Sequence, residues 1–248
     1  MADVTQTSSR PLAVVTGSSS GIGLELARIF AKNGYDLVIV AENDHIFEVQ
    51  EQIAAQSSVD VKAYEIDLSN FTNVEEFYHI LHNLDRPIDI LALNAGVGVA
   101  GSFAKQTSLE DELTMINLNV VSTVHLAKRV VSTMVRQGHG KVLFTSAVAS
   151  LAPEPYDAVY AATKAFVQSF AMALRKELIS TGVSITALLP SATNTNFYHR
   201  AGLEHTRLAR AKKNDPALVA KKGYEGLMNG EEQVMVGSLS DEEHLHDE

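Results

Sequence analysis

Two strand-like runs of this chain are apolar at nearly every position. Residues 37–40 (LVIV) and 88–93 (IDILAL) contain one polar residue, Asp89. A strand with one face in water alternates apolar and polar side chains, whereas a strand of a parallel sheet is covered by helices on both faces. The two runs therefore predict strands inside a parallel sheet.

Strand-like runs alternate with amphipathic helical stretches along most of the chain. Repeated strand–helix–strand units with short links are typical of a doubly wound, Rossmann-type α/β fold with helices on both faces of the sheet. We expect one domain over residues 1–248, because no internal repeat or interdomain linker interrupts the pattern. The expected strands are 11–16, 37–40, 61–66, 88–93, 142–145, 183–189 and 233–236. The expected helices are 24–32, 46–55, one opening at Thr72 with a capping box, 108–137, 157–180 and one beginning at Asp215-Pro216.

Charge and composition exclude several classes of protein. The formal net charge of −10 argues against a nucleic-acid or anionic-membrane surface. The chain has no cysteine, which rules out disulfides, thiol catalysis and thiolate metal sites and fits the expected cytoplasmic location. No apolar run reaches the roughly 18 residues of a membrane span, and the polar start, residues 1–10, is unlike a secretory signal.

Residues 191–214 interrupt the regular pattern with a polar, irregular stretch that carries several basic residues. In a doubly wound sheet, ligands bind beyond the carboxyl ends of the strands, so a long insert there is a candidate substrate lid. A surface excursion with a solvated basic face explains the composition equally well. The chain ends, residues 1–9 and 240–248, are expected to be flexible.

A glycine-rich motif, residues 16–23 (TGSSSGIG), lies between the first expected strand and the first expected helix. Gly17, Gly21 and Gly23 permit a tight turn, close approach of a pyrophosphate and close helix–strand packing. Backbone N–H groups at a helix N-terminus bind phosphate. A glycine-serine turn without a ligand is the alternative. The motif is not a P-loop, because no Gly-Lys-Ser/Thr follows.

Tyr160 and Lys164 stand four residues apart, which on a helix places both side chains on one face. An ammonium beside a phenol favours the phenolate, so the lysine lowers the tyrosine pKa from its usual value of about 10. Such a tyrosine can give a proton to, or take one from, a reacting carbonyl or alcohol. The pair alone is a weak signal, because many helices contain it by chance.

These motifs, taken together, resemble the short-chain dehydrogenase/reductase family in its single-domain branch. The resemblance extends from Leu12 to about Ser238 and includes Asp67-Leu68 and Asn94-Ala95-Gly96 after expected strands. It implies an enzyme that binds NAD(H) or NADP(H) and interconverts small-molecule alcohols and carbonyls. It also implies a homodimer or homotetramer, assembled through the helices expected at 108–137 and 157–180.

The resemblance implies a role for each matching catalytic residue. Tyr160 would be the acid/base, and Lys164 would lower its pKa and hold the nicotinamide ribose. Ser146 would position the substrate oxygen, and Asn117 would anchor a proton-relay water near Lys164. Asn119 competes for this last role, but the Asn-Leu pattern favours Asn117. The implied cofactor contacts are Gly17, Ser19, Ser20, Gly21, Ile22, Gly23, Glu42, Asp67, Leu68, Asn94, Ala95, Gly96, Tyr160, Lys164, Pro190, Thr193 and Thr195.

Three positions depart from the family pattern. Ser146 precedes Tyr160 by fourteen residues, one more than is common, so we expect an extra residue in the intervening loop. Ser191 follows Pro190 where glycine is usual, and Val120 replaces a frequent glycine. None of these departures removes a catalytic group from the expected set.

The end of the second expected strand bears on the choice of cofactor. Ala41 stands where the family often has an NAD-selecting aspartate, and Glu42 stands where NADP enzymes often have arginine. Glu42 would repel a 2′-phosphate of charge roughly −1.5 to −2. Ser20 likewise lacks the basic side chain that many NADP enzymes carry there. We therefore expect NAD, with NADP as the alternative if Glu42 turns into solvent and leaves Asn43 and the serine hydroxyls to bind phosphate.

Two other functions stay open. A catalytically silent nucleotide-binding redox sensor would need the glycine motif but not the acid/base pair. An epimerase or dehydratase of the extended branch would have a longer C-terminal region and another glycine spacing. No metal is expected: His79 and His82 near Glu75 and Glu76 are more typical of a solvated helix face.

Overall fold

The computed structural model describes residues 10–153, 155–195 and 213–237. Its strands are β1 Leu12–Thr16, β2 Asp36–Ala41, β3 Val61–Glu65, β4 Ile90–Leu93, β5 Gly140–Thr145, β6 Val183–Pro190 and β7 Gln233–Val236. Its α-helices are α1 Gly21–Lys32, α2 His45–Gln56, α3 Phe71–His82, α4 Leu109–Ile116, α5 Ser122–Gln137, α6 Ala158–Glu177 and α9 Pro216–Asn229. A π-helical segment, Asn117–Val121, joins α4 to α5, and a 3₁₀ turn, Val148–Ser150, follows β5.

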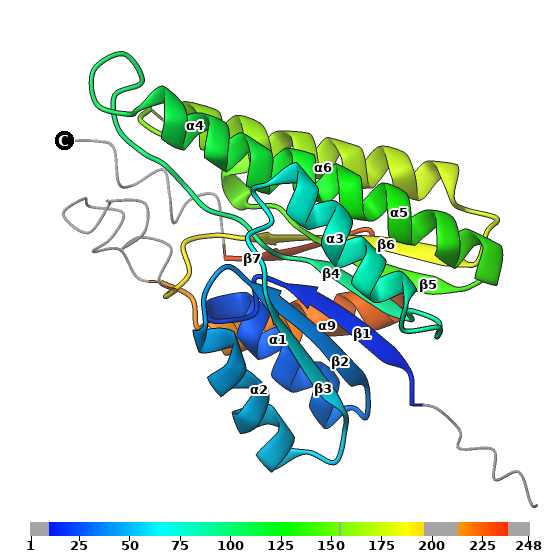
Figure 1. The fold of residues 1–248 in the computed structure, drawn as a ribbon. Helices are drawn as coiled ribbons and strands as arrows, with labels where there is room; N and C mark the ends of the chain where they lie inside the picture. The colour runs from blue at the N-terminus through cyan, green and yellow to red at the C-terminus, as the bar shows by residue number, and fades with distance from the viewer. Residues whose placement is uncertain (1–9, 154, 196–212, 238–248) are drawn as a thin grey trace, which may run out of the picture.

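The seven strands form one parallel sheet in the order β3-β2-β1-β4-β5-β6-β7. The chain builds outward from β1 to β3 and then returns to add β4 on the other side of β1. The segments that follow β1 and β4 therefore leave toward opposite faces of the sheet (Figure 1), and doubly wound sheets bind ligands in the crevice at this switch point. The predicted fold class is confirmed.

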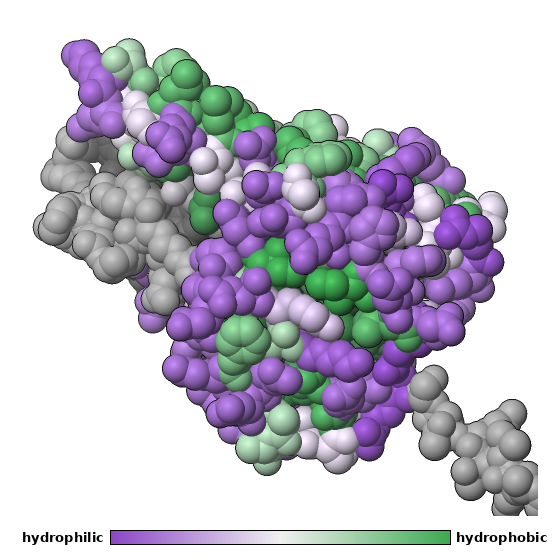
Figure 2. Space-filling view, in the orientation of Figure 1, coloured by the Kyte–Doolittle hydropathy of each residue, from purple (hydrophilic) through white to green (hydrophobic). Residues whose placement is uncertain are grey.

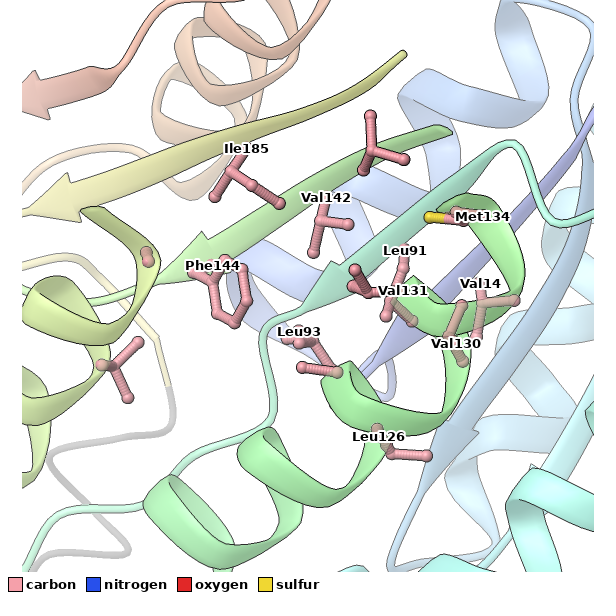
Figure 3. Packing of buried hydrophobic residues seen from close by; sticks show 14 of the residues in the cluster. Val14, Leu91, Leu93, Leu126, Val130, Val131, Met134, Val142, Phe144 and Ile185 are labelled. Atoms are coloured by element: carbon pink, nitrogen blue, oxygen red, sulfur yellow. The ribbon is translucent and has the colours of Figure 1, made fainter. Parts of the chain in front are cut away.

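Helices cover both faces of the sheet (Figure 1): α3, α4, α5 and α6 lie on one side, and α1, α2 and α9 lie on the other. Successive residues of a strand alternate between the two cores. In β1, Val14 belongs to the core under α5, and Val15 belongs to the core over α1. Figure 3 shows the first core, where Leu126, Val130 and Met134 of α5 meet side chains of the central strands.

The observed helix boundaries agree with some of the boundaries predicted from the sequence and differ from others. Asp215 caps α9 by accepting a hydrogen bond from the amide of Ala217, as predicted. Helix α3 starts earlier than predicted, because Asn70, and not Thr72, is its N-cap. The helix expected over residues 108–137 is interrupted by the π segment, which inserts an extra residue into one turn.

Some predictions fall outside the described residues. These are the flexible ends, 1–9 and 240–248, and residues 196–212 of the candidate lid. Among the helices that are described, none is long and apolar enough to cross a bilayer.

Candidate active site

The predicted motifs follow strands that are neighbours in the sheet. The glycine loop follows β1, Asn94 to Gly96 follow β4, and Ser146 follows β5. Because all strands are parallel, these carboxyl ends lie at one edge of the sheet. The fold thus gathers motifs from distant parts of the sequence around one crevice.

The glycine loop depends on three glycines for two reasons. Gly17 and Gly21 have φ values of 68° and 59°, in the left-handed region that favours glycine. At Gly23 the reason is space, because a Cβ there would overlap the carbonyl oxygen of Gly17 and stand 2.6 Å from Nδ2 of Asn94. Helix α1 therefore starts directly against the end of β1.

The N-terminus of α1 faces this crevice. Ser20 is the N-cap, and its side chain makes no capping hydrogen bond. The amides of the first helical turn have no partner within a helix and bind anions well. Thr195 lies over the loop, since a Cβ on Gly21 would be 2.8 Å from its Cγ2. This arrangement suits the pyrophosphate of a dinucleotide.

Asn94 holds three strand ends together. Its Nδ2 donates to the carbonyl oxygens of Thr16 and Gly17, at 3.2 and 3.3 Å. Its Oδ1 accepts a hydrogen bond of 3.2 Å from the hydroxyl of Thr145. The side chain expected as a cofactor contact is thus also a brace between the glycine loop, β4 and β5.

Tyr160 and Lys164 lie on one face of α6, as their spacing predicts. Nζ of Lys164 is 5.8 Å from the centroid of the Tyr160 ring and donates to the carbonyl oxygen of Thr145 at 3.2 Å. A Cβ on Gly96 would be 3.1 Å from this Nζ, so Gly96 leaves room for the ammonium. Burial lowers the pKa of Lys164 from 10.5 to about 8, because the charged form loses its hydration.

Asn119, and not Asn117, lies beside Lys164. The side-chain amide of Asn119 donates to the carbonyl oxygen of Val97 at 2.9 Å and to the hydroxyl of Thr163 at 3.0 Å. Its Oδ1 accepts from the amide of Val97 and would be 3.0 Å from a Cβ on Gly96. Asn117 is exposed. The sequence-based choice of Asn117 therefore does not fit the geometry.

A signal in the sequence could have identified Asn119. Glu112, Met115 and Asn119 are all buried, and they follow one another at helical spacings of three and four. Asn117 lies off this buried stripe. Extending the stripe from the apolar residue Met115 would have favoured Asn119.

Ser146 turns its hydroxyl toward α6. The Oγ atom donates to the carbonyl oxygen of Lys164 at 2.8 Å, and the side chain is 1% exposed. The Ser146 amide continues the sheet by donating to the carbonyl oxygen of Leu188 at 2.8 Å. The hydroxyl expected to meet a substrate oxygen is thus engaged on the helix side.

Comparison with known proteins identifies the family of this chain. A family model described as short chain dehydrogenase matches residues 11–205. The chain belongs to the short-chain dehydrogenase/reductase family. The predicted enzyme class, an NAD(P)-dependent dehydrogenase or reductase, is confirmed at this level.

Relatives and solved structures of the short-chain dehydrogenase/reductase family cover most of the chain. Sulfoacetaldehyde reductase 2 of Chromohalobacter salexigens is 31% identical over 75% of this chain and 74% of its own. A short-chain dehydrogenase from Sphingobium yanoikuyae in complex with NADPH is 30% identical, with a TM-score of 0.86 over 95% of this chain and 92% of that one. A bulky-bulky ketone specific alcohol dehydrogenase from Comamonas testosteroni is 27% identical, with a TM-score of 0.81 over 95% and 90%.

In this member of the short-chain dehydrogenase/reductase family, some of the remaining expected cofactor contacts lie in loops at the strand ends and others are packed in or against the two hydrophobic cores. The carboxylate of Asp67 accepts from the amide and hydroxyl of Ser69, at 2.8 and 2.9 Å. Leu68 is buried in the core, and Ile22 packs against the other core. The Ser19 hydroxyl accepts from Nδ2 of Asn43 at 3.4 Å, at the end of β2.

A clasp at the base of the candidate lid was not predicted. Thr193 pairs with Asn214 in an isolated parallel bridge, and the amide of Asn194 donates to the Asn214 carbonyl oxygen at 2.9 Å. Nδ2 of Asn214 also donates to the hydroxyl of Ser191 at 2.8 Å. The two described ends of the insert, just beyond Pro190 and just before α9, are therefore tied together.

The part of the chain that the structure describes contains no group of three or more His, Asp or Glu side chains placed to hold a metal. Near the histidines considered above, the Glu75 carboxylate is engaged by His125 and Arg129. Hydrogen bonds from these two side chains lower the pKa of Glu75, with His125 contributing most.

Proposed function

We propose that this protein interconverts an alcohol and a carbonyl by hydride transfer to or from a nicotinamide, with Tyr160 as the acid/base. The observation that carries the proposal is the buried Lys164 ammonium, held 5.8 Å from the Tyr160 ring at the crevice. A cation at that place stabilises the phenolate and makes the phenol a better acid at neutral pH.

Each group near Lys164 has a role in this proposal. Lys164 tunes Tyr160 and holds the nicotinamide ribose, and the glycine loop holds the pyrophosphate. The proton-relay role first given to Asn117 passes to Asn119, which shares the Gly96 wall with Lys164. A nicotinamide bound in the crevice would supply or accept the hydride, while Tyr160 moves the proton.

The experiment is a panel of ketones, aldehydes and alcohols, followed by the absorbance of reduced nicotinamide. Sulfoacetaldehyde and bulky ketones belong in it, because similar proteins carry those names. We expect turnover of at least one carbonyl. Binding of NADH or NADPH without turnover of any compound would favour the silent redox sensor, which the retained Tyr160 and Lys164 do not otherwise support. The cytoplasmic location stays a prediction.

For the cofactor we favour NAD(H), with NADP(H) as the alternative. Glu42 is exposed at the end of β2, and Asn43 donates to its Oε1 at 3.2 Å. We infer that this acidic group meets the adenosine ribose, an arrangement that suits a 2′-OH better than a 2′-phosphate. The similar Sphingobium protein was solved with NADPH, which keeps the alternative open.

Glu42→Arg is expected to shift the ratio of the NADPH and NADH dissociation constants about 10- to 100-fold toward NADPH. The reason is that a repelling carboxylate is replaced by a charge-assisted phosphate donor. Fluorescence titration of both reduced cofactors measures the ratio. Glu51→Arg, the same charge change on α2, is the control and should leave the ratio near its original value. Tighter binding of NADPH by the unaltered protein would contradict the NAD preference.

We also propose a homodimer or homotetramer. Large apolar side chains are exposed along the helices above the sheet, and Figure 2 shows a hydrophobic patch over α4. Leu109, Leu113, Val121 and Phe166 belong to this set, with exposed fractions of 75, 49, 38 and 43%. Contiguous apolar patches of this kind mark interfaces.

Light scattering at micromolar concentration is expected to give at least twice the mass of one chain. Leu113→Glu should reduce this mass, because a carboxylate would be buried without a partner. Ile179→Glu, an exposed apolar site beyond the end of α6, is the control and should leave the mass unchanged. A monomer at these concentrations would reject the assembly.

A further inference from the structure

The Ser146 hydroxyl has one hydrogen to donate, and it donates this hydrogen to the main-chain carbonyl oxygen of Lys164. A carbonyl oxygen inside a helix already accepts a hydrogen bond from the amide four residues later in the chain. The bond from Ser146 is therefore an additional link between the end of β5 and α6. To donate to a substrate oxygen, Ser146 would have to break this bond and turn from a site where it is 1% exposed.

The residues at the end of β5 alternate between two faces. Phe144 lies in the core on the α6 side, and Ser146 points to the same side. Thr145 points the other way, with its hydroxyl on Asn94, the brace of the glycine loop. Ala147 has φ −159° and ψ 160°, so the chain stays extended and the alternation continues. Ala147 therefore presents its methyl group on the Thr145 side.

The Lys164 side chain meets the same strand end from the other direction. Its Nζ donates to the carbonyl oxygen of Thr145, while its own carbonyl oxygen accepts from Ser146. Two hydrogen bonds of 3.2 and 2.8 Å thus fasten one residue of α6 to two consecutive residues of the strand end. Such a double attachment fixes both the backbone and the ammonium of Lys164.

We propose that Ser146 is a positioning residue for Lys164, and that the position facing the reacting oxygen is Ala147, which offers no hydroxyl. This inference rests on the proposed function. Tyr160 would then be the sole hydroxyl donor to the developing oxyanion from α6 and the β5 end. This assignment also accounts for the spacing. Ser146 precedes Tyr160 by fourteen residues, one more than is common in the family, whereas Ala147 is one residue nearer to Tyr160 and has the common spacing.

The positioning role is tested with Ser146→Ala and the conservative variant Ser146→Thr. We expect Ser146→Ala to weaken cofactor binding about 3- to 10-fold and to lower kcat by a similar factor, because Lys164 loses one attachment. Ser146→Thr keeps a hydroxyl and should restore both values. A directly acting oxyanion donor would instead lose about 10²- to 10³-fold in kcat with unchanged cofactor affinity, and that result would overturn the proposal.

The empty facing position is tested by Ala147→Ser. A second donor at the oxyanion should raise kcat at least about 10-fold and leave cofactor affinity unchanged. Ala149→Ser, two residues along the same loop and partly exposed, is the matched control and should not raise kcat. An Ala147→Ser protein that binds cofactor normally and is no faster than the unaltered protein would refute this half of the proposal.

Failure of the proposed function can be told apart from failure of this inference. If no carbonyl is turned over by the unaltered protein but Ala147→Ser gains activity, the missing hydroxyl is supported and the proposed function fails. If neither protein is active, the cofactor dissociation constants decide. A loss in Ser146→Ala that Ser146→Thr restores supports the positioning role, and equal constants in all three proteins overturn it.

Discussion

Replacing Tyr160 with phenylalanine should lower kcat by about 10²- to 10⁴-fold, the usual contribution of a general acid or base. The ring remains, so its packing on α6 and the 5.8 Å approach of the Lys164 ammonium are retained. We therefore expect the dissociation constant for the reduced cofactor and the melting temperature to stay close to those of the unaltered protein. Steady-state kinetics and cofactor titration on the same samples separate the two effects.

Tyr224→Phe is the matched control for this experiment. Tyr224 lies on α9, on the opposite face of the sheet from α6, and packs edge-to-face on Phe30. Its loss of a hydroxyl should leave kcat unchanged. If Tyr160→Phe keeps near-native kcat on any substrate found, Tyr160 is not the acid/base, and the chemistry must be assigned to another group.

The second large effect is a pH dependence of stability that comes from Lys164. Burial holds its pKa in the folded protein near 8, below 10.5 for an unfolded chain. Between these values the unfolded chain binds more protons at this lysine, so the free energy of unfolding rises with pH. Burying the charged ammonium costs up to about 3 kcal/mol below pH 8, and this cost disappears as pH approaches 10.5.

Urea unfolding of the unaltered protein and of Lys164→Met, at pH 7 and near pH 10, measures this effect. The unaltered protein should gain stability relative to Lys164→Met as pH rises, by up to about 3 kcal/mol. Lys176→Met, on the same helix but exposed, should show no such relative change. A constant difference between the unaltered protein and Lys164→Met across this range would show that the ammonium is not desolvated in the folded state.

The sequence predicted the fold because its signals were local. The apolar run at residues 37–40 indicated a strand covered by helices on both faces. The strand expected at residues 233–236 has the same bounds in the structure, where it pairs with β6. The glycine loop and the spacing of Tyr160 and Lys164 likewise depend on neighbouring residues alone. Predictions from such local signals are reliable when the local preference of a segment agrees with its packing in the folded protein.

Two of the site predictions, Asn117 and Ser146, depended on how a single residue is rotated about its helix or strand, which motif spacing does not fix. Asn117 and Asn119 differ by about half a helical turn, and the π segment Asn117–Val121 changes the phase of the helix there. Ser146 and Ala147 differ by one step of strand alternation, which reverses the face. Motif spacing does not report which face of β5 meets α6, so only the folded structure placed the Ser146 hydroxyl on Lys164.

The clasp formed by Thr193, Asn194 and Asn214 has a consequence for how much variation in the intervening sequence the fold can accept. It fixes where the chain leaves the sheet after β6 and where it returns before α9. The two anchor points are held by hydrogen bonds among described residues on either side of positions 196–212. Doubling the length of a flexible loop adds only about 0.6 kcal/mol of closure entropy. The sequence between the two anchors can therefore vary in length at a small cost in stability while the anchors stay in place.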